Sequence, residues 1–239
     1  MFYNLTKNYN NFINSIGTNI INGPFKGMKY ISESVGSCHM PKILGIYENE
    51  IYPTLLNFLS NSDLFVDIGA AEGYYAVGSA IKYPNLNVIA FEMDKTGRQY
   101  ISNLKKRNNV DNVEIRKKFS NVDFFSIQKS AYNRITYLID IEGEEINIFS
   151  KYHNHFNNSY FIIEIHDRVS NEIESYLKRF YSNTHNTYII PIKDKSISDL
   201  SIKIPTLLKL FKNKLIYKHL LSEWREYEQS FLVCEPIIG

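Results

Sequence analysis

Residues 64–78, LFVDIGAAEGYYAVG, constrain the fold of this 239-residue chain more than any other stretch. The apolar start predicts a short buried strand, the glycines predict a tight turn, and the residues after Gly73 predict the start of a helix. Gly69 and Gly73 allow backbone conformations that side chains disfavour and a close approach of the backbone to a ligand. The spacing is not the dinucleotide pattern G-x-G-x-x-G, because Ala71 stands at the second glycine position.

The groups around this turn suit a ligand that carries an ammonium and a carboxylate at one end. Asp67, at the end of the strand, can accept a hydrogen bond from an ammonium group or position the loop. The amides that open the helix can bind a carboxylate, which the helix dipole also favours. An amino acid has both groups, and S-adenosyl-L-methionine carries a methionine tail. The residues expected to contact this ligand are Asp67, Gly69, Ala70, Ala71, Gly73 and Tyr74.

A second predicted strand, residues 88–92, ends in an acid 25 positions after Asp67. In a doubly wound sheet, an acid at the end of the second strand binds ribose hydroxyls. Glu92 is therefore the expected ribose ligand, and Met93 is expected to lie against the adenine. A solvated acid next to a helix start is the alternative, and the glycine turn at this distance favours the nucleoside interpretation.

Three motifs of the chain resemble those of a known enzyme group. VDIGAAEG and AFEMD resemble the first two motifs of class I S-adenosylmethionine-dependent methyltransferases, and YLIDIEGEE (137–145) resembles the fourth-strand segment of the FkbM-type branch. The resemblance covers residues 64–165. It implies S-adenosyl-L-methionine as co-substrate and O-methylation of sugars or related metabolites, commonly in polysaccharide or natural-product biosynthesis. Transfer to the amine of an amino sugar and a catalytically silent cofactor-binding subunit are the alternatives.

Strand and helix patterns alternate along most of the chain, which predicts parallel strands with crossover helices on both faces. The expected fold is α/β, with a doubly wound, mostly parallel seven-stranded sheet of the Rossmann-like methyltransferase type. Residues 1–60 are expected to form a helical N-terminal extension and residues 61–239 the methyltransferase domain. Strands are predicted at 64–68, 87–92, 112–116, 135–141, 160–165, 187–192 and 230–234, and helices at 48–59, 74–83, 95–107, 144–156 and 173–180.

Outside the alternating region, the patterns are less specific. Residues 1–22 place apolar side chains at helical spacing, which predicts an amphipathic helix that docks on the domain or on a second subunit. The segment 25–37 is expected to be a plain surface loop. A substrate-facing role for this region is the alternative, with the candidates Lys26, Lys29, Tyr30 and His39. Residues 193–222 are a candidate lid or dimer surface.

Composition limits the partners and the compartment. Twenty-seven basic and 25 acidic residues nearly balance, so charge gives no support to a nucleic-acid partner. Cys38 and Cys234 are too few for a disulfide framework and indicate a reduced, cytoplasmic protein. No apolar run has the length of a membrane span, and the first residues lack a signal core. The expected partner is a small-molecule or glycan acceptor, and a homodimer stays open.

Acids and a histidine follow two of the predicted strands. Asp140 ends the fourth strand, and Glu164 and His166 end the fifth. Ligands of open α/β sheets bind beyond the carboxyl ends of the strands, and strand alternation puts Glu164 and His166 on one side. We therefore expect the three side chains to converge beside the methionine end of the cofactor, which Asp140 is also expected to contact. Solvated acids and a histidine that caps a strand are the alternative.

A sugar hydroxyl is a poor nucleophile until its proton is removed, so O-methylation benefits from a base, typically by ~10²–10⁴ in rate. Histidine titrates near working pH, and His166 is the predicted base. Asp140 and Glu164 are expected to orient it or to hold the acceptor. A divalent metal held by Asp140, Glu164 and Asp167 is the second route. We favour the metal-free route and expect no metal ligands.

Two further motifs receive structural interpretations. His153 and His155 lie two apart on a predicted helix, so they would point to different sides and could not easily share a metal. Trp224 and Arg225 precede the last strand, where a packed aromatic with a solvated arginine is expected and a substrate rim is the alternative.

Overall fold

The computed structural model describes residues 17–32, 38–141, 158–166, 172–200, 221–223, 225 and 229–237. Across these ranges, every helix is too short or too polar to cross a membrane.

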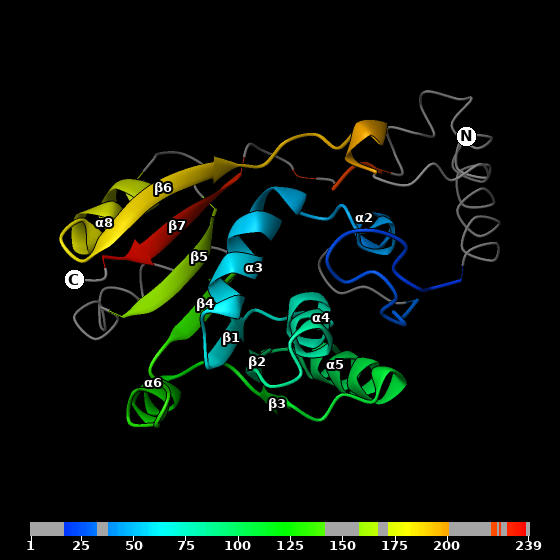
Figure 1. The fold of residues 1–239 in the computed structure, drawn as a ribbon, viewed down its shortest axis with the longest axis horizontal. Helices are drawn as coiled ribbons and strands as arrows, with labels where there is room; N and C mark the ends of the chain where they lie inside the picture. The colour runs from blue at the N-terminus through cyan, green and yellow to red at the C-terminus, as the bar shows by residue number, and fades with distance from the viewer. Residues whose placement is uncertain are drawn as a thin grey trace.

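A single seven-stranded sheet crosses the molecule (Figure 1). Its order is β3-β2-β1-β4-β5-β7-β6; neighbours from β3 through β5 run parallel, and β7 runs antiparallel to both β5 and β6. This arrangement confirms the predicted doubly wound, mostly parallel sheet. The strands are β1 (Leu64–Ile68), β2 (Asn87–Phe91), β3 (Val113–Arg116), β4 (Ile135–Ile139), β5 (Ser159–Ile165), β6 (His185–Pro191) and β7 (Ser230–Pro236).

Helices cover both faces of the sheet (Figure 1). One apolar cluster joins the sheet to α3, α4 and α5, and a second joins the opposite face to α6 and α8. All five residues of β1 are buried, as expected for a parallel strand with both faces covered. The helices are α2 (His39–Leu44), α3 (Tyr52–Ser60), α4 (Tyr74–Lys82), α5 (Lys95–Asn108), α6 (Asn121–Gln128) and α8 (Glu172–Tyr181), with 3₁₀ turns η1 (Asn49–Ile51) and η3 (Ile197–Asp199).

The predicted elements that fall on described residues agree with the structure to within two residues at each end, except that the helix predicted at 48–59 begins as the turn η1 and continues as α3 only from Tyr52. Two helices, α2 and α6, were not predicted. The six residues of α2 include Pro41, which obscures a helical pattern. The start of α6 carries a capping box in which Ser120 and Asp123 bond each other's backbone, and this is the signal that could have found it. The helix predicted over residues 1–22 is wrong for its described part, because residues 17–22 form a turn and an isolated bridge between Asn19 and Lys29. Residues 1–16 of that prediction, the helix predicted at 144–156 and residues 201–220 of the candidate lid or dimer surface lie outside the described residues.

The prediction of a plain surface loop after residue 25 is wrong. Phe25, Met28 and Tyr30 are buried and belong to the cluster that contains α4. Phe25 packs so closely on α4 that a Cβ at Gly78 would lie 2.5 Å from its ring. We call residues 17–32 and 38–47 the cover; the blue segment of Figure 1 lies beside α4. The cover shares one apolar core with the sheet, because buried residues of both belong to the same cluster.

Candidate functional site

The glycine loop, residues 69–73, joins β1 to α4 and has left-handed backbone at three positions. Gly69 and Gly73 have φ of 90° and 93°, and Ala71 has φ of 48°. A Cβ on Gly69 would lie 1.7 Å from the carbonyl oxygen of Asp140, so only glycine fits there. The loop after β1 therefore packs directly against the residue that follows β4.

Asp67 brings a buried acid to the start of this loop. It is 3% exposed, and among the described residues one carboxylate oxygen, Oδ2, has no hydrogen-bond partner. Burial raises the pKa of Asp67 to about 7, against a hydrogen bond from the backbone of Ala76 that lowers it. A buried acceptor without a donor is costly. The ammonium group of an amino-acid ligand would supply the missing donor, so Asp67 fits the expected cofactor.

Glu92 lies between the glycine loop and the start of α5. Its Oε2 accepts the backbone N–H of Ala71 at 2.7 Å, and its Oε1 accepts that of Asp94 at 2.6 Å. Each carboxylate oxygen can accept a second bond, so ribose hydroxyls still find acceptors there. Met93 is 70% exposed beside it, as an adenine contact requires. These residues fit a nucleoside.

The remaining residues expected at the cofactor contribute backbone rather than side chains. Tyr74 is buried, and its hydroxyl is hydrogen-bonded to that of Tyr52 at 2.7 Å. Ala70 is buried as well. What these residues can offer to a ligand is the amide-rich start of α4.

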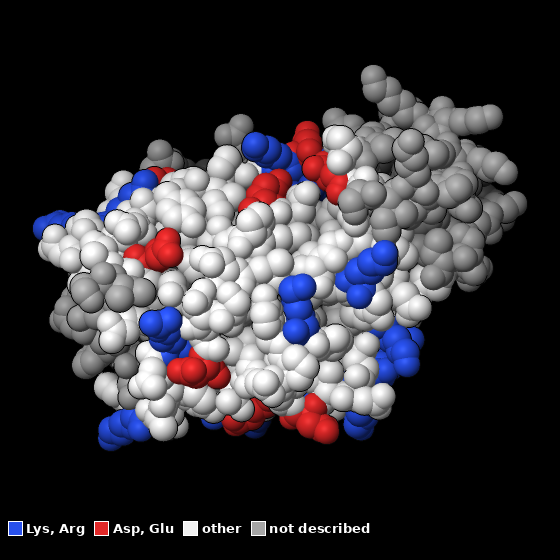
Figure 2. All heavy atoms as spheres, in the orientation of Figure 1, with Lys and Arg blue, Asp and Glu red and all other residues white. Residues whose placement is uncertain are grey.

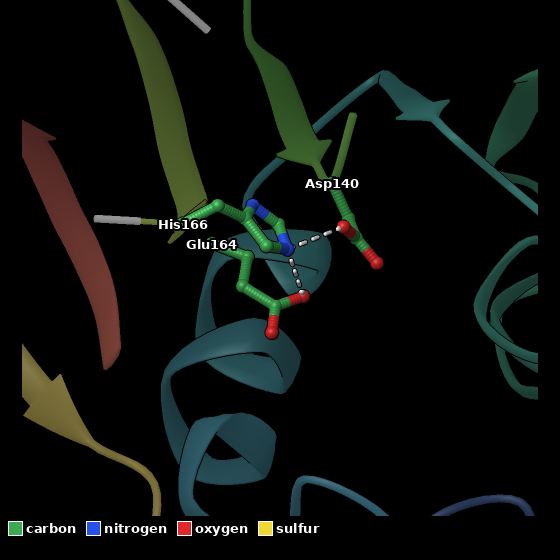
Figure 3. Close-up of side chains that lie close together, drawn as sticks. All are labelled: Asp140, Glu164 and His166. Atoms are coloured by element: carbon green, nitrogen blue, oxygen red, sulfur yellow. Dashed lines mark ion pairs between the residues drawn. The ribbon is translucent and has the colours of Figure 1, made fainter. Parts of the chain in front are cut away.

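The acid–histidine cluster consists of Asp140, Glu164 and His166, and Figure 3 shows their side chains pointing toward one another from the ends of β4 and β5. Nε2 of His166 lies 3.4 Å from Oδ1 of Asp140 and 3.9 Å from Oε2 of Glu164. The side chains of His166 and Glu164 are each 4% exposed, and that of Asp140 is 38% exposed. The structure thus brings together the three residues that were expected to converge.

Charges around the cluster set the protonation of Glu164. Burial and the charge of Glu48 raise the pKa of Glu164 to about 7, while Arg225 and His166 oppose this shift. The guanidinium of Arg225 bonds Glu48 at 2.6 Å and also bonds Glu164. Its side chain is only 17% exposed, so the expectation of a solvated arginine is wrong. Arg225 stays charged and holds one face of Glu164.

The cluster also has the donor atoms of a metal site. One ligand atom from each of Asp140, Glu164 and His166 lies within 4.8 Å of the others. A divalent cation there would approach the guanidinium that already bonds Glu164, which disfavours cation binding electrostatically. The other residues named in the metal and rim predictions, Asp167, His153, His155 and Trp224, lie outside the described residues.

Sequence reasoning missed two residues that interact electrostatically with the cluster. Tyr47 is buried, and burial together with the charges of Glu48, Glu164 and Asp140 raises the pKa of its hydroxyl. Glu48 accepts a hydrogen bond from Tyr75 at 2.7 Å and contacts Arg225. Tyr47 is the last residue of the cover and Glu48 follows it, about 100 residues away in sequence, where no local pattern could connect them to β4 or β5.

The described surface carries both signs of charge. On the face in Figure 2, Lys and Arg side chains are interspersed with Asp and Glu side chains over a mostly uncharged surface. Cys38 and Cys234 are both free, as expected.

No protein-family model matches the sequence, and no curated protein matches it. Solved structures do. Precorrin-6y C5,15-methyltransferase from Geobacter metallireducens is 12% identical, with 77% of this chain and 87% of that chain covered and a TM-score of 0.50. An rRNA methylase from Streptococcus thermophilus is 11% identical, with 79% and 97% covered and a TM-score of 0.50. The chain therefore has the Rossmann-like fold of class I S-adenosylmethionine-dependent methyltransferases. The two proteins have different acceptors, so the likeness leaves the acceptor open.

Proposed function

We propose that the chain is an S-adenosyl-L-methionine-dependent O-methyltransferase whose acceptor is a hydroxyl of a carbohydrate or small metabolite. The observation that carries this proposal is the packing of Gly69 against the carbonyl of Asp140. It joins a loop suited to the methionine tail of the cofactor to a cluster suited to proton removal. Methyl transfer to oxygen needs these two functions side by side.

The residues proposed to hold the cofactor are Asp67 for the ammonium, the amides of the glycine loop for the carboxylate, Glu92 for the ribose and Met93 for the adenine. When bound, S-adenosyl-L-methionine supplies a methyl group activated by a sulfonium. The buried carboxylate of Asp67 also suits this positively charged ligand. Its Oδ2 accepts no hydrogen bond from a described residue, so it can accept one from the ligand.

His166 is the proposed base. Its Nε2 accepts the acceptor hydroxyl proton while the new carbon–oxygen bond forms and the carbon–sulfur bond breaks, and the sulfur keeps the electron pair as a neutral thioether. Asp140 and Glu164 face the same nitrogen and stabilise the imidazolium that results. Water then removes the proton from His166. The base must be neutral to act, so turnover falls at low pH.

One observation favours a second candidate, transfer to the amine of an amino sugar. Asp140 and Glu164 place carboxylates next to His166, and carboxylates also bind an ammonium group before it is deprotonated. From another class, a catalytically silent cofactor-binding subunit would share the fold and the glycine loop. Formation of S-adenosylhomocysteine with any acceptor distinguishes an enzyme from such a subunit.

The finer assignments belong to the same proposal. They are the FkbM-type branch, polysaccharide or natural-product biosynthesis in the cytoplasm, residues 1–60 as an extension, and residues 61–239 as the methyltransferase domain. On the face that Figure 2 shows, Lys and Arg are mixed with Asp and Glu, which supports an acceptor other than nucleic acid. A homodimer stays open.

Calorimetry and an acceptor screen test the proposal. S-adenosyl-L-methionine and S-adenosylhomocysteine should bind, and NAD should bind much more weakly. Labelled cofactor should then transfer its methyl group to a member of a panel of nucleotide sugars and oligosaccharides. NAD affinity equal to that of S-adenosyl-L-methionine would overturn the cofactor assignment. Methylation of a control RNA with no transfer to the carbohydrate panel would overturn the acceptor assignment.

A further inference from the structure

Glu72 lies inside the glycine loop, yet it is 0% exposed. Its Oε1 accepts hydrogen bonds from the ammonium of Lys42 at 2.5 Å and from the hydroxyl of Tyr30 at 2.7 Å. Both donors belong to the cover, and Lys42 lies on α2. A side chain of the loop is therefore anchored by a segment outside the sheet.

The surroundings keep this anchor charged and fixed. Burial alone would raise the pKa of Glu72, but the charge of Lys42 and the hydrogen bonds from Lys42 and Tyr30 outweigh it, so the pKa lies below its usual value. The ammonium of Lys42 lies 4.7 Å from the ring centre of Tyr47 and 5.7 Å from that of Tyr74. Lys42 itself is 3% exposed. Aromatic faces attract a desolvated cation, so Lys42 is held between Glu72 and two rings.

The loop needs such anchors because its backbone is strained. Ala71, next to Glu72, has a φ of 48°, which residues with a Cβ seldom adopt. On one side of this residue, the carboxylate of Glu92 accepts its N–H. On the other side, Glu72 is held by the cover. The direction of the loop amides thus depends on two carboxylates. That of Glu92, near the start of α5, bonds the loop backbone, and that of Glu72 is bonded by Lys42 of α2.

We propose that Lys42, with Tyr30, is a positioning residue for the cofactor: acting through Glu72, it fixes the glycine loop in the geometry that binds the methionine tail. This inference rests on the proposed function. It gives the cover a role in the site although its side chains Lys42 and Tyr30 need not touch the ligand. The loop amides are set by the cover before the cofactor arrives, which reduces the ordering cost of binding.

Lys42→Met tests the inference, with S-adenosylhomocysteine as the calorimetric probe. Since one partner of a buried pair is removed, the variant should melt at a lower temperature and bind the probe about tenfold more weakly. Lys42→Arg should recover most of the affinity, because it restores a charged donor to Glu72. Tyr30→Phe removes one hydrogen bond with little change in volume and should weaken binding about fivefold.

The double variant Lys42→Met/Glu72→Gln separates positioning from stability. It leaves no unpaired buried charge, so its melting temperature should return toward wild type while probe affinity stays reduced. Lys195→Met is the matched control: the side chain of Lys195 is equally buried and pairs with Glu50 at 2.5 Å and with Glu223 at 3.3 Å, neither of which belongs to the glycine loop. It should lower the melting temperature and leave probe affinity unchanged.

Two results would overturn the inference while leaving the proposed function intact. One is wild-type probe affinity in Lys42→Met and Tyr30→Phe. The other is a double variant that regains affinity together with melting temperature, because the effect would then be one of stability. A wild-type chain that binds no S-adenosylhomocysteine would instead overturn the proposed function and, with it, this inference.

Discussion

Two buried glutamates at the carboxyl ends of the strands behave in opposite ways. Glu72, in the glycine loop, has a pKa below its usual value because Lys42 and Tyr30 outweigh its burial. Glu164, in the acid–histidine cluster, has a pKa raised to about 7 because burial and Glu48 outweigh Arg225 and His166. Both side chains contact a cation, so the number of neighbouring carboxylates decides whether the pKa is raised or lowered.

The difference divides the site into two halves of different chemistry. At the glycine loop, each glutamate carboxylate has its own donors, and the geometry is fixed. At the cluster, Glu48 and Glu164 share the guanidinium of Arg225, so acid is in excess and protons bind near neutral pH. A fixed half suits recognition of a constant ligand. A half that titrates near pH 7 suits proton removal from an acceptor.

The largest effect should come from His166→Ala, which tests the proton-accepting half. Turnover should fall by about 10²-fold or more, because the base is lost, while cofactor affinity stays nearly intact. The acidic limb of the pH–rate profile should disappear as well. Steady-state kinetics across pH and calorimetry measure both quantities.

The control for this variant is His185→Ala. His185 is also buried, and it bonds the carbonyl of Ser159 away from the cluster. It should lower the melting temperature without the 10²-fold loss of turnover. Near-normal turnover in His166→Ala, combined with loss of wild-type activity on treatment with a chelator, would replace the base by a metal ion.

A smaller effect is expected from Glu92→Ala, which tests the recognition half. Cofactor binding should weaken by about 1.5–3 kcal/mol, the range for hydrogen bonds to a charged group. Titration calorimetry with S-adenosylhomocysteine measures this change. Glu114→Ala, at an exposed acid on the neighbouring strand β3, is the control and should leave affinity unchanged. An unchanged dissociation constant in Glu92→Ala would remove Glu92 from the ribose role.

The smallest effect concerns the stability of the ligand-free chain. The pKa of Asp67 is raised from its ordinary value of 3.8 to about 7 by burial. The folded state therefore binds this proton more tightly, and the stability that Asp67 contributes is present below pH 3.8 and lost as pH rises through 7. Asp67→Asn cannot ionise, so its stability relative to wild type should increase between pH 4 and pH 8.

Denaturant unfolding at pH 4 and pH 8 measures this difference, and Asp111→Asn, at an exposed acid, should show none. The same Asp67→Asn variant should bind the cofactor more weakly, because its amide no longer offers a carboxylate to an ammonium group. A pH dependence of stability identical to that of wild type would show that Asp67 is ionised in the fold without a penalty.

Local patterns predicted the recognition half. Asp67, Gly69, Gly73 and Glu92 lie on two consecutive strand–turn–helix units, where hydrophobic period and glycine spacing suffice to place them. The convergence of the acid–histidine cluster was predicted by one further argument, that the carboxyl ends of parallel strands lie at the same edge of the sheet.

Long-range contacts could not be predicted from the sequence. Arg225 meets Glu48 across 177 positions, and Lys42 meets Glu72 from a short helix whose direction depends on tertiary packing. Neither contact leaves a periodic trace in the sequence. The prediction of a solvated Arg225 was wrong because it relied on the rule that charged side chains are usually exposed. Only the folded chain shows the three carboxylates that pair with the guanidinium of Arg225.

The position of β7 between β5 and β6 has a consequence for the order in which the chain assembles. In the sheet order, β6 is an edge strand whose neighbour is β7. About 40 residues separate them in the chain, so during synthesis β6 waits on the order of 2–8 s for its partner to be made. The parallel strands β1 to β5 can pair earlier. The nascent chain should therefore form the half proposed for cofactor recognition on the ribosome well before Arg225 and β7 complete the half proposed for proton removal.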